Sequence, residues 1–157
     1  PEHPSPPKSL KELITFNEAH QEQVMPFFAQ ELFEKAECRG DLSSETYLES
    51  LKECRRLSRQ QGIDAFMQKH GLDAFIAPTS GPAWLTDSVN GDPVSIETSF
   101  TPSAVAGYPG ISVPLGFISG LPVGLSFYGG AWSERMLLRC AHAFENATKA
   151  QIAPEIS

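Results

Sequence analysis

The stretch Ile111-Ser-Val-Pro-Leu-Gly-Phe-Ile-Ser-Gly-Leu-Pro-Val-Gly-Leu-Ser-Phe127 decides the fold of this chain. Apolar residues occupy every second position over 111–117 and again over 123–127, a pattern typical of strands that bury one face. Ser119-Gly120 lies between the two runs and is a tight-turn pair, so the stretch predicts a β-hairpin. Because proline has no N–H to donate to a sheet, Pro114 and Pro122 are expected at a bulge, a sheet edge or a strand end.

Two helices are expected near the start of the chain. Ser9 followed by Glu12 is a capping box, which predicts a helix from there to about residue 19. Pro26 suits the first turn of a second helix, and Gly40 suits its C-terminal cap. Apolar residues recur at helical spacing between these two positions.

A third, longer helix is expected to begin at Ser43 or Ser44 and to run to about residue 70, with Gly71 as its stop. Gly62 lies inside this helix and weakens it, since glycine costs about 1 kcal/mol relative to alanine in a helix interior.

Shorter elements follow this helix. Residues 73–77 predict a buried strand, Thr101 begins a short helix through 106, and Ser133 caps a last helix to about 147. Residues 79–100 are rich in Thr, Ser, Gly, Asn and Asp and predict an irregular loop. An irregular connection of this length inside a compact domain is usually functional or mobile.

Composition changes sharply along the chain. No proline occurs from Phe27 to Ala77, and nine of the twelve glycines lie between Gly81 and Gly130. We therefore expect a Pro-rich lead or linker over 1–8, a single α/β domain over 9–150 and a tail over 151–157. Within the domain, 9–71 is helical and 72–148 holds strand, loop, hairpin and helix. The absence of an initiator Met and the Pro-rich start indicate part of a longer gene product.

Charge and cysteine content narrow the function classes. The chain has 12 basic and 19 acidic residues and a net charge of −7, which argues against a nucleic-acid partner. No apolar run has the roughly 18 to 20 residues that span a bilayer, so no membrane association is expected. Cys38, Cys54 and Cys140 show no zinc spacing and indicate three reduced thiols in a cytoplasmic protein. No metal and no cofactor are expected, because no ligand spacing or phosphate-binding glycine loop occurs.

A self-contained catalytic constellation is also missing from the pattern. Gly124-Leu-Ser-Phe-Tyr-Gly129 fails the nucleophile-elbow spacing at its last glycine, and the lysines lie in polar or helical surroundings. One alternative remains, an independent hydrolase that uses Ser126 or Ser112 with His142. Its weakness is that the sequence offers no third group to orient the base.

The hairpin and its flanks resemble the C-terminal end of the amidase signature family. The resemblance rests on 108–117, on 120–129 with its GLPVG motif, and on 134–145 with the pattern LL-x-x-A-x-x-[FY]E. Residues 15–20 and 71–79 are also similar to this family, and peptide-amidase-like enzymes are the nearest branch. The resemblance covers nearly the whole of 9–148.

This resemblance implies an α/β fold with a mixed sheet, including the hairpin near 111–128, covered by helices. It also implies hydrolysis of a carboxylic amide C–N bond by a Ser–Ser–Lys triad, acting on an amide-bearing small molecule or a peptide amide. The family's Gly/Ser-rich signature block and its lysine lie in its N-terminal part and have no counterpart here. No catalytic residue can therefore be assigned in this chain, and the chain alone is expected to be inactive.

Candidate substrate contacts come from the long loop after the 73–77 strand. Loops that follow strand ends are common ligand sites in α/β proteins, and we select Trp84, Asp87 and Asn90. A packed surface loop is the alternative interpretation. For the chain as a whole, the alternatives are a non-enzymatic interaction or assembly domain and a part of an amidotransferase-like complex. An exposed apolar face would favour a possible homodimer.

Overall fold

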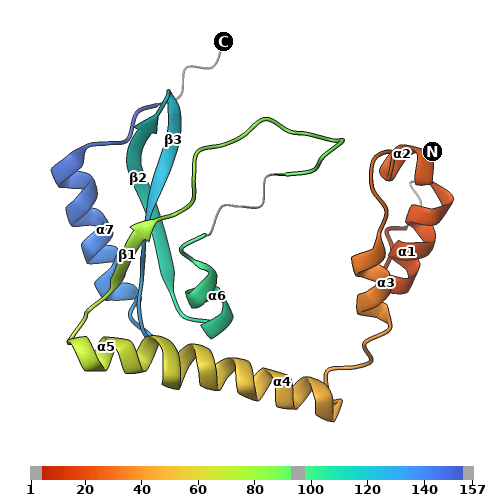
Figure 1. The fold of residues 1–157 in the computed structure, drawn as a ribbon, viewed down its shortest axis with the longest axis horizontal. Coiled ribbons are helices and arrows are strands. Elements are labelled where there is room, and N and C mark those ends of the chain that lie inside the picture. Colours follow the sequence, from red (N-terminus) through yellow and green to blue (C-terminus); the bar gives the residue numbers. More distant parts are fainter. Residues whose placement is uncertain (1–4, 93–97, 154–157) are drawn as a thin grey trace. The chain divides into compact units, whose positions relative to one another are not determined.

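The chain is described by a computed structural model that covers residues 5–92 and 98–153. Its described residues form two compact units. The first runs to Leu48 and includes Asp87–Gly91, and the second contains Glu49–Thr86 and the residues from Asp92 onward. Figure 1 gives the element labels used below.

The first unit contains three short helices, α1 (Leu10–Ala19), α2 (Gln21–Val24) and α3 (Glu31–Glu37). The Ser9 side chain accepts a hydrogen bond from the Glu12 N–H, which confirms the predicted N-cap of α1. The Glu12 carboxylate accepts from the Lys8 N–H, one position before the reciprocal bond of a capping box.

The second helix does not begin at Pro26 as predicted. The short α2 precedes Pro26, and α3 begins only after Gln30. Gln30 is buried, and its side-chain amide accepts from Asn17 Nδ2 at 3.0 Å and donates to the Ile14 carbonyl at 3.1 Å. These bonds tie the segment before α3 to α1, so tertiary contacts override the helical spacing of residues 26–30.

One long helical segment then connects the two units in sequence. It comprises α4 (Glu45–Arg55), the π-helical η1 (Arg56–Ile63) and α5 (Asp64–His70). Leu48 N–H donates to the Ser44 carbonyl, so the predicted start is confirmed, and Gly71 ends the segment in the left-handed conformation at φ 60°. Gly62 departs from helical geometry and marks a kink.

The hairpin is confirmed as β2 (Gly110–Ile118) and β3 (Leu121–Tyr128). Its turn residues Ser119 and Gly120 both have positive φ, which matches the right-handed twist of the strands. The strand β1 (Phe75–Pro78) pairs with β3, so the sheet order is β1-β3-β2. The α/β class is confirmed, and these three strands pair antiparallel to their neighbours.

A bulge sets the register of the hairpin. Near the turn Gly116 pairs with Val123, whereas beyond the bulge Pro114 pairs with Gly124, so Leu115 is an extra residue on β2. Pro114 thus lies at a bulge on an outer strand of the described sheet, as predicted. Pro122 lies beyond the stretch of β3 that β1 pairs with, near the end of the strand.

The core lies between the hairpin and α7 (Glu134–Thr148). It consists of five buried side chains from β2, β3 and α7: Val113, Leu125, Phe127, Leu137 and Ala141. Phe144 packs against this cluster, with its ring 6.0 Å from that of Phe127. The last helix is confirmed, although the Ser133 hydroxyl donates to the Gly130 carbonyl instead of capping the helix.

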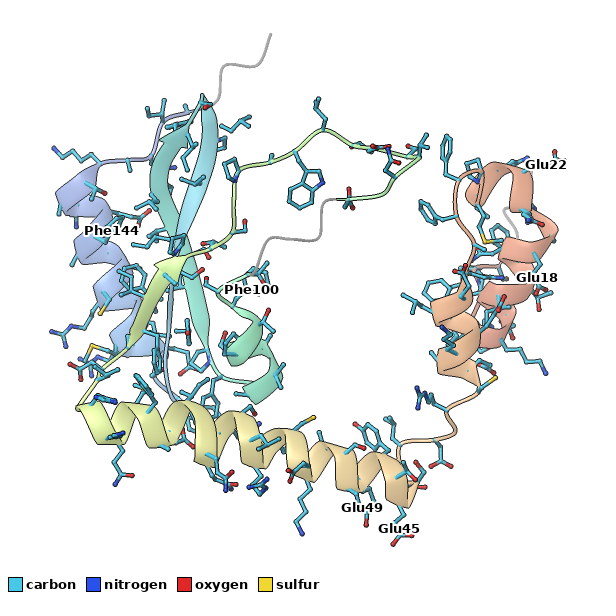
Figure 2. All side chains as sticks on the ribbon, in the orientation of Figure 1. Glu18, Glu22, Glu45, Glu49, Phe100 and Phe144 are labelled. Carbon is cyan, nitrogen blue, oxygen red and sulfur yellow. The ribbon has the colours of Figure 1, made fainter. Side chains whose placement is uncertain are left out.

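The short α6 (Thr101–Ala106) occupies the other side of the sheet from α7 (Figure 1). Figure 2 shows Phe144 on α7 and Phe100 at the start of α6 on opposite sides of the strands. The sheet therefore has one face covered by α7, while its other face is only partly covered.

Candidate functional site

Three hydroxyl groups meet on the sheet face opposite α7. Ser112 and Ser126 are directly paired across β2 and β3, and their Oγ atoms lie 2.8 Å apart. Thr79, which directly follows β1, places its Oγ1 atom 2.8 Å from Ser126 Oγ and 3.0 Å from Ser112 Oγ. We call Thr79, Ser112 and Ser126 the hydroxyl cluster.

The strand alternation explains why these side chains gather. Val113 and Leu125 point into the core with α7, so their neighbours Ser112 and Ser126 point to the opposite face. Ser126 is buried and Ser112 is exposed, so the cluster extends from the interior of the sheet to its surface.

Gly124 leaves the space that Thr79 occupies. A Cβ atom at this position would lie only 2.8 Å from Thr79 Oγ1. The glycine thus allows the three hydroxyls to meet.

The hydroxyl cluster lacks the partner that a nucleophile requires. Its side-chain hydrogen bonds within the described residues join the three hydroxyls to one another. His142 lies on α7, on the other side of the sheet, and its Nε2 atom is 2.9 Å from Asn146 Nδ2. The geometry therefore does not support a hydrolase built from Ser126 or Ser112 with His142.

The predicted substrate contacts are held by bonds within their own loop. Trp84 Nε1 donates to Asp92 Oδ1 at 3.0 Å. Asp87 and Asn90 are brought together, because Asp87 Oδ2 accepts from Asn90 Nδ2 at 2.8 Å. The backbone N–H groups of Val89 and Asn90 both donate to Asp87 Oδ1 at 2.9 Å.

These bonds make Asp87 the organiser of a turn. The backbone and then the side-chain hydrogen bonds from Asn90, with that from Val89 N–H, lower the pKa of Asp87 below its ordinary value. The carboxylate is accordingly held ionised, and its charge is directed at its own backbone. Nothing in this geometry contradicts a substrate contact, and the exposed side chains of Trp84 and Asn90 leave room for one.

A second set of contacts fixes α6 beside the hydroxyl cluster. Arg59 Nε on η1 donates to the Ala106 carbonyl at the end of α6, and its guanidinium lies 5.3 Å from the centre of the Tyr108 ring. The Tyr108 hydroxyl donates to Asp64 Oδ2 at 2.9 Å. Burial first, and then this bond to Asp64, raises the pKa of the Tyr108 hydroxyl, so the neutral donor is favoured.

The remaining features of the described residues are brief. In 5–92 and 98–153, no three His, Cys, Asp or Glu side chains are grouped so that they could hold a metal ion. None of the helices there has the length and apolar character needed to cross a membrane. Cys38, Cys54 and Cys140 are free thiols.

Comparison with known proteins identifies the family. The family model described as Amidase matches residues 7–138. The chain belongs to the amidase family. The GLPVG motif that carried the resemblance in the sequence forms the start of β3, next to the hairpin turn.

Solved and curated amidases match almost the whole chain. The structure of the peptide amidase PAM in complex with the competitive inhibitor chymostatin matches with a TM-score of 0.90 and 44% identity, over 98% of this chain and 31% of that chain. A probable amidase of Arabidopsis thaliana is 35% identical over 156 residues, which is 96% of this chain and 26% of the relative.

Glutamyl-tRNA(Gln) amidotransferase also contains a related polypeptide. The matching component from Marinobacter nauticus is 44% identical over 105 residues, which is 65% of this chain and 21% of the relative. The chain thus spans between a fifth and a third of the length of these relatives.

Sequence reasoning missed the hydroxyl cluster as a unit. It considered Ser112 and Ser126 separately, each as a nucleophile, and gave Thr79 no role. The bulge at Leu115 was the missing information, because it decides which serine faces which.

Proposed function

We propose that this chain is the C-terminal portion of an amidase that hydrolyses a carboxylic amide C–N bond, with a peptide amide as the favoured substrate class. The match of 98% of the chain to 31% of a peptide amidase, at a TM-score of 0.90, carries this proposal. In the proposed enzyme, the catalytic residues lie in a part of the protein outside these 157 residues.

The proposed mechanism divides the work between the two parts. A serine attacks the amide carbonyl, a second serine passes the proton to a lysine, and backbone N–H groups stabilise the oxyanion. This chain contributes the sheet with its α7 support, and the loop after β1 as a wall of the substrate site. The mutual hydrogen bonds of the hydroxyl cluster support this division, because they engage its serines without a base.

Assays on the full-length protein and on the chain alone test this proposal. We expect the protein encoded by the complete gene to release ammonia from C-terminally amidated peptides, and residues 1–157 alone to release none above background. Turnover by the isolated chain would contradict the assignment of its catalytic residues to another part. A full-length protein that is folded but inactive on amides would overturn the proposed activity.

An amidotransferase component is the second candidate, favoured by the amidotransferase relatives. The match to the amidases covers 96–98% of the chain, compared with 65% for the Marinobacter protein, which favours the simple amidase. Glutamine as the only amide hydrolysed, and only with companion polypeptides present, would support the second candidate. We also propose a cytoplasmic enzyme, because its exposed thiols Cys38 and Cys54 would be prone to oxidation elsewhere.

We propose further that Trp84, Asp87 and Asn90 contact the substrate. Replacing Trp84 by alanine in the full-length enzyme is expected to lower kcat/KM for a peptide amide about three- to tenfold, mainly through KM, since an aromatic contact and an N–H donor are both lost. Leu85→Ala is the matched control, because Leu85 is the neighbouring residue and is 92% exposed. Equal kinetics for the two variants would contradict the substrate role of Trp84.

A further inference from the structure

An apolar groove lies beside the sheet face opposite α7. It has a volume of about 940 Å³ and is formed by η1, α5, α6 and the end of β1. Phe75 and Tyr128 form its floor as a directly opposed cross-strand pair, with ring centres 5.0 Å apart. Tyr128 shares a face with Ser126, two residues before it, so this floor belongs to the same face as the hydroxyl cluster.

The walls of this groove expose large apolar side chains. Leu57 on η1, Phe66 on α5 and Val105 on α6 are each about half exposed, at 51%, 50% and 52%. They come from three helices of the second unit and converge on one hollow. Single exposed apolar residues are ordinary, but a contiguous apolar hollow of this kind marks an interaction surface.

We infer that this groove is the docking surface for the part of the amidase that lies outside these 157 residues. The inference rests on the proposed function. The occupant is an apolar segment of that part, and it completes the cover of the sheet face that α6 covers only in part. In the assembled enzyme, Leu57, Phe66 and Val105 are buried.

Two observations favour this occupant over a second copy of the chain. The peptide amidase structure superposes on 98% of this chain with only 31% of its own length, so most of such an enzyme lies outside the matched region. The other face of the described sheet is already covered by α7, whose Leu137 and Ala141 are each 2% exposed. The remaining part therefore finds its apolar counterpart on the groove side.

Cys54 gives a direct probe, because it lines the groove and its thiol is exposed in this chain. We propose to treat the native full-length protein with a maleimide and to follow the Cys54-containing peptide by mass spectrometry. Labelling is expected to be at least 100-fold slower than in the urea-unfolded protein. Leu138→Cys is the control, since Leu138 lies on α7 and is 58% exposed. Cys54 labelling as fast as this control would overturn the inference.

A charge in the groove provides an independent test. Val105→Asp in the full-length protein is expected to lower the midpoint temperature of thermal unfolding by several degrees, because an unpaired carboxylate would be buried. Leu138→Asp, at a similarly exposed position of the chain, should change it little. Equal effects of the two variants would count against a covered groove.

Two further results separate the remaining possibilities. Protection of Cys54 that disappears when sedimentation shows the full-length protein to be a monomer would identify a second copy as the occupant and overturn the inference. A full-length protein that protects Cys54 but hydrolyses no amide would refute the proposed function and leave the docking surface standing.

Discussion

Replacing Leu137 by alanine is expected to lower the free energy of unfolding by about 2–5 kcal/mol. Leu137 is 2% exposed and is the largest fully buried side chain of the described residues. It lies between α7 and the hairpin, in contact with a cluster that includes Val113, Leu125 and Phe127. Truncation removes apolar contacts and leaves a cavity that this short helix–hairpin layer has little freedom to fill.

Urea denaturation of the protein, with its midpoint and slope recorded, measures this effect. Leu138→Ala is a stringent control because it removes the same atoms from the next residue of the same helix, where the side chain is 58% exposed. We expect its effect to stay within about 0.5 kcal/mol. Similar losses for both variants would mean that α7 does not pack on the hairpin through Leu137.

The local pattern of residues was sufficient to predict most elements of the second unit. The alternation over 111–127 and the Ser119-Gly120 pair predicted the hairpin, because side-chain period and turn chemistry are local properties. Gly71 likewise marked the end of a helix through its left-handed conformation. In the first unit the same reasoning was wrong about Pro26, because the bonds of Gln30 to α1 depend on contacts between residues distant in sequence.

The candidate site was less predictable, because it depends on register. In a hairpin with a two-residue turn and no bulge, Ser112 would face Phe127 instead of Ser126. The extra residue Leu115 shifts the pairing by one position and brings Ser112 opposite Ser126, while Val113 and Leu125 stay on the core side. The proline at 114 indicated a bulge among other options, but it could not fix which residue is extra.

Gly62→Ala is expected to lower the free energy of unfolding by about 1–3 kcal/mol, the usual cost of forcing an extra carbon into a packed site. Helix propensity alone predicts the opposite, since alanine is about 1 kcal/mol better than glycine in a helix interior. The geometry of η1 decides between the two. A Cβ atom at Gly62 would lie 2.6 Å from the carbonyl oxygen of Leu57, five residues earlier. Because that oxygen belongs to the backbone, it can move only if the helix changes its winding.

The sign of the measured change therefore reports whether the kink belongs to the folded protein. Gln61→Ala serves as the control, because Gln61 precedes Gly62 on the same helix and is exposed, and we expect it to change the free energy of unfolding by no more than about 0.5 kcal/mol. A stabilising Gly62→Ala would mean that the helix runs straight through this position. A destabilising one would show that the kink is needed where η1 turns Ile63, 5% exposed, into the interior and lines the groove.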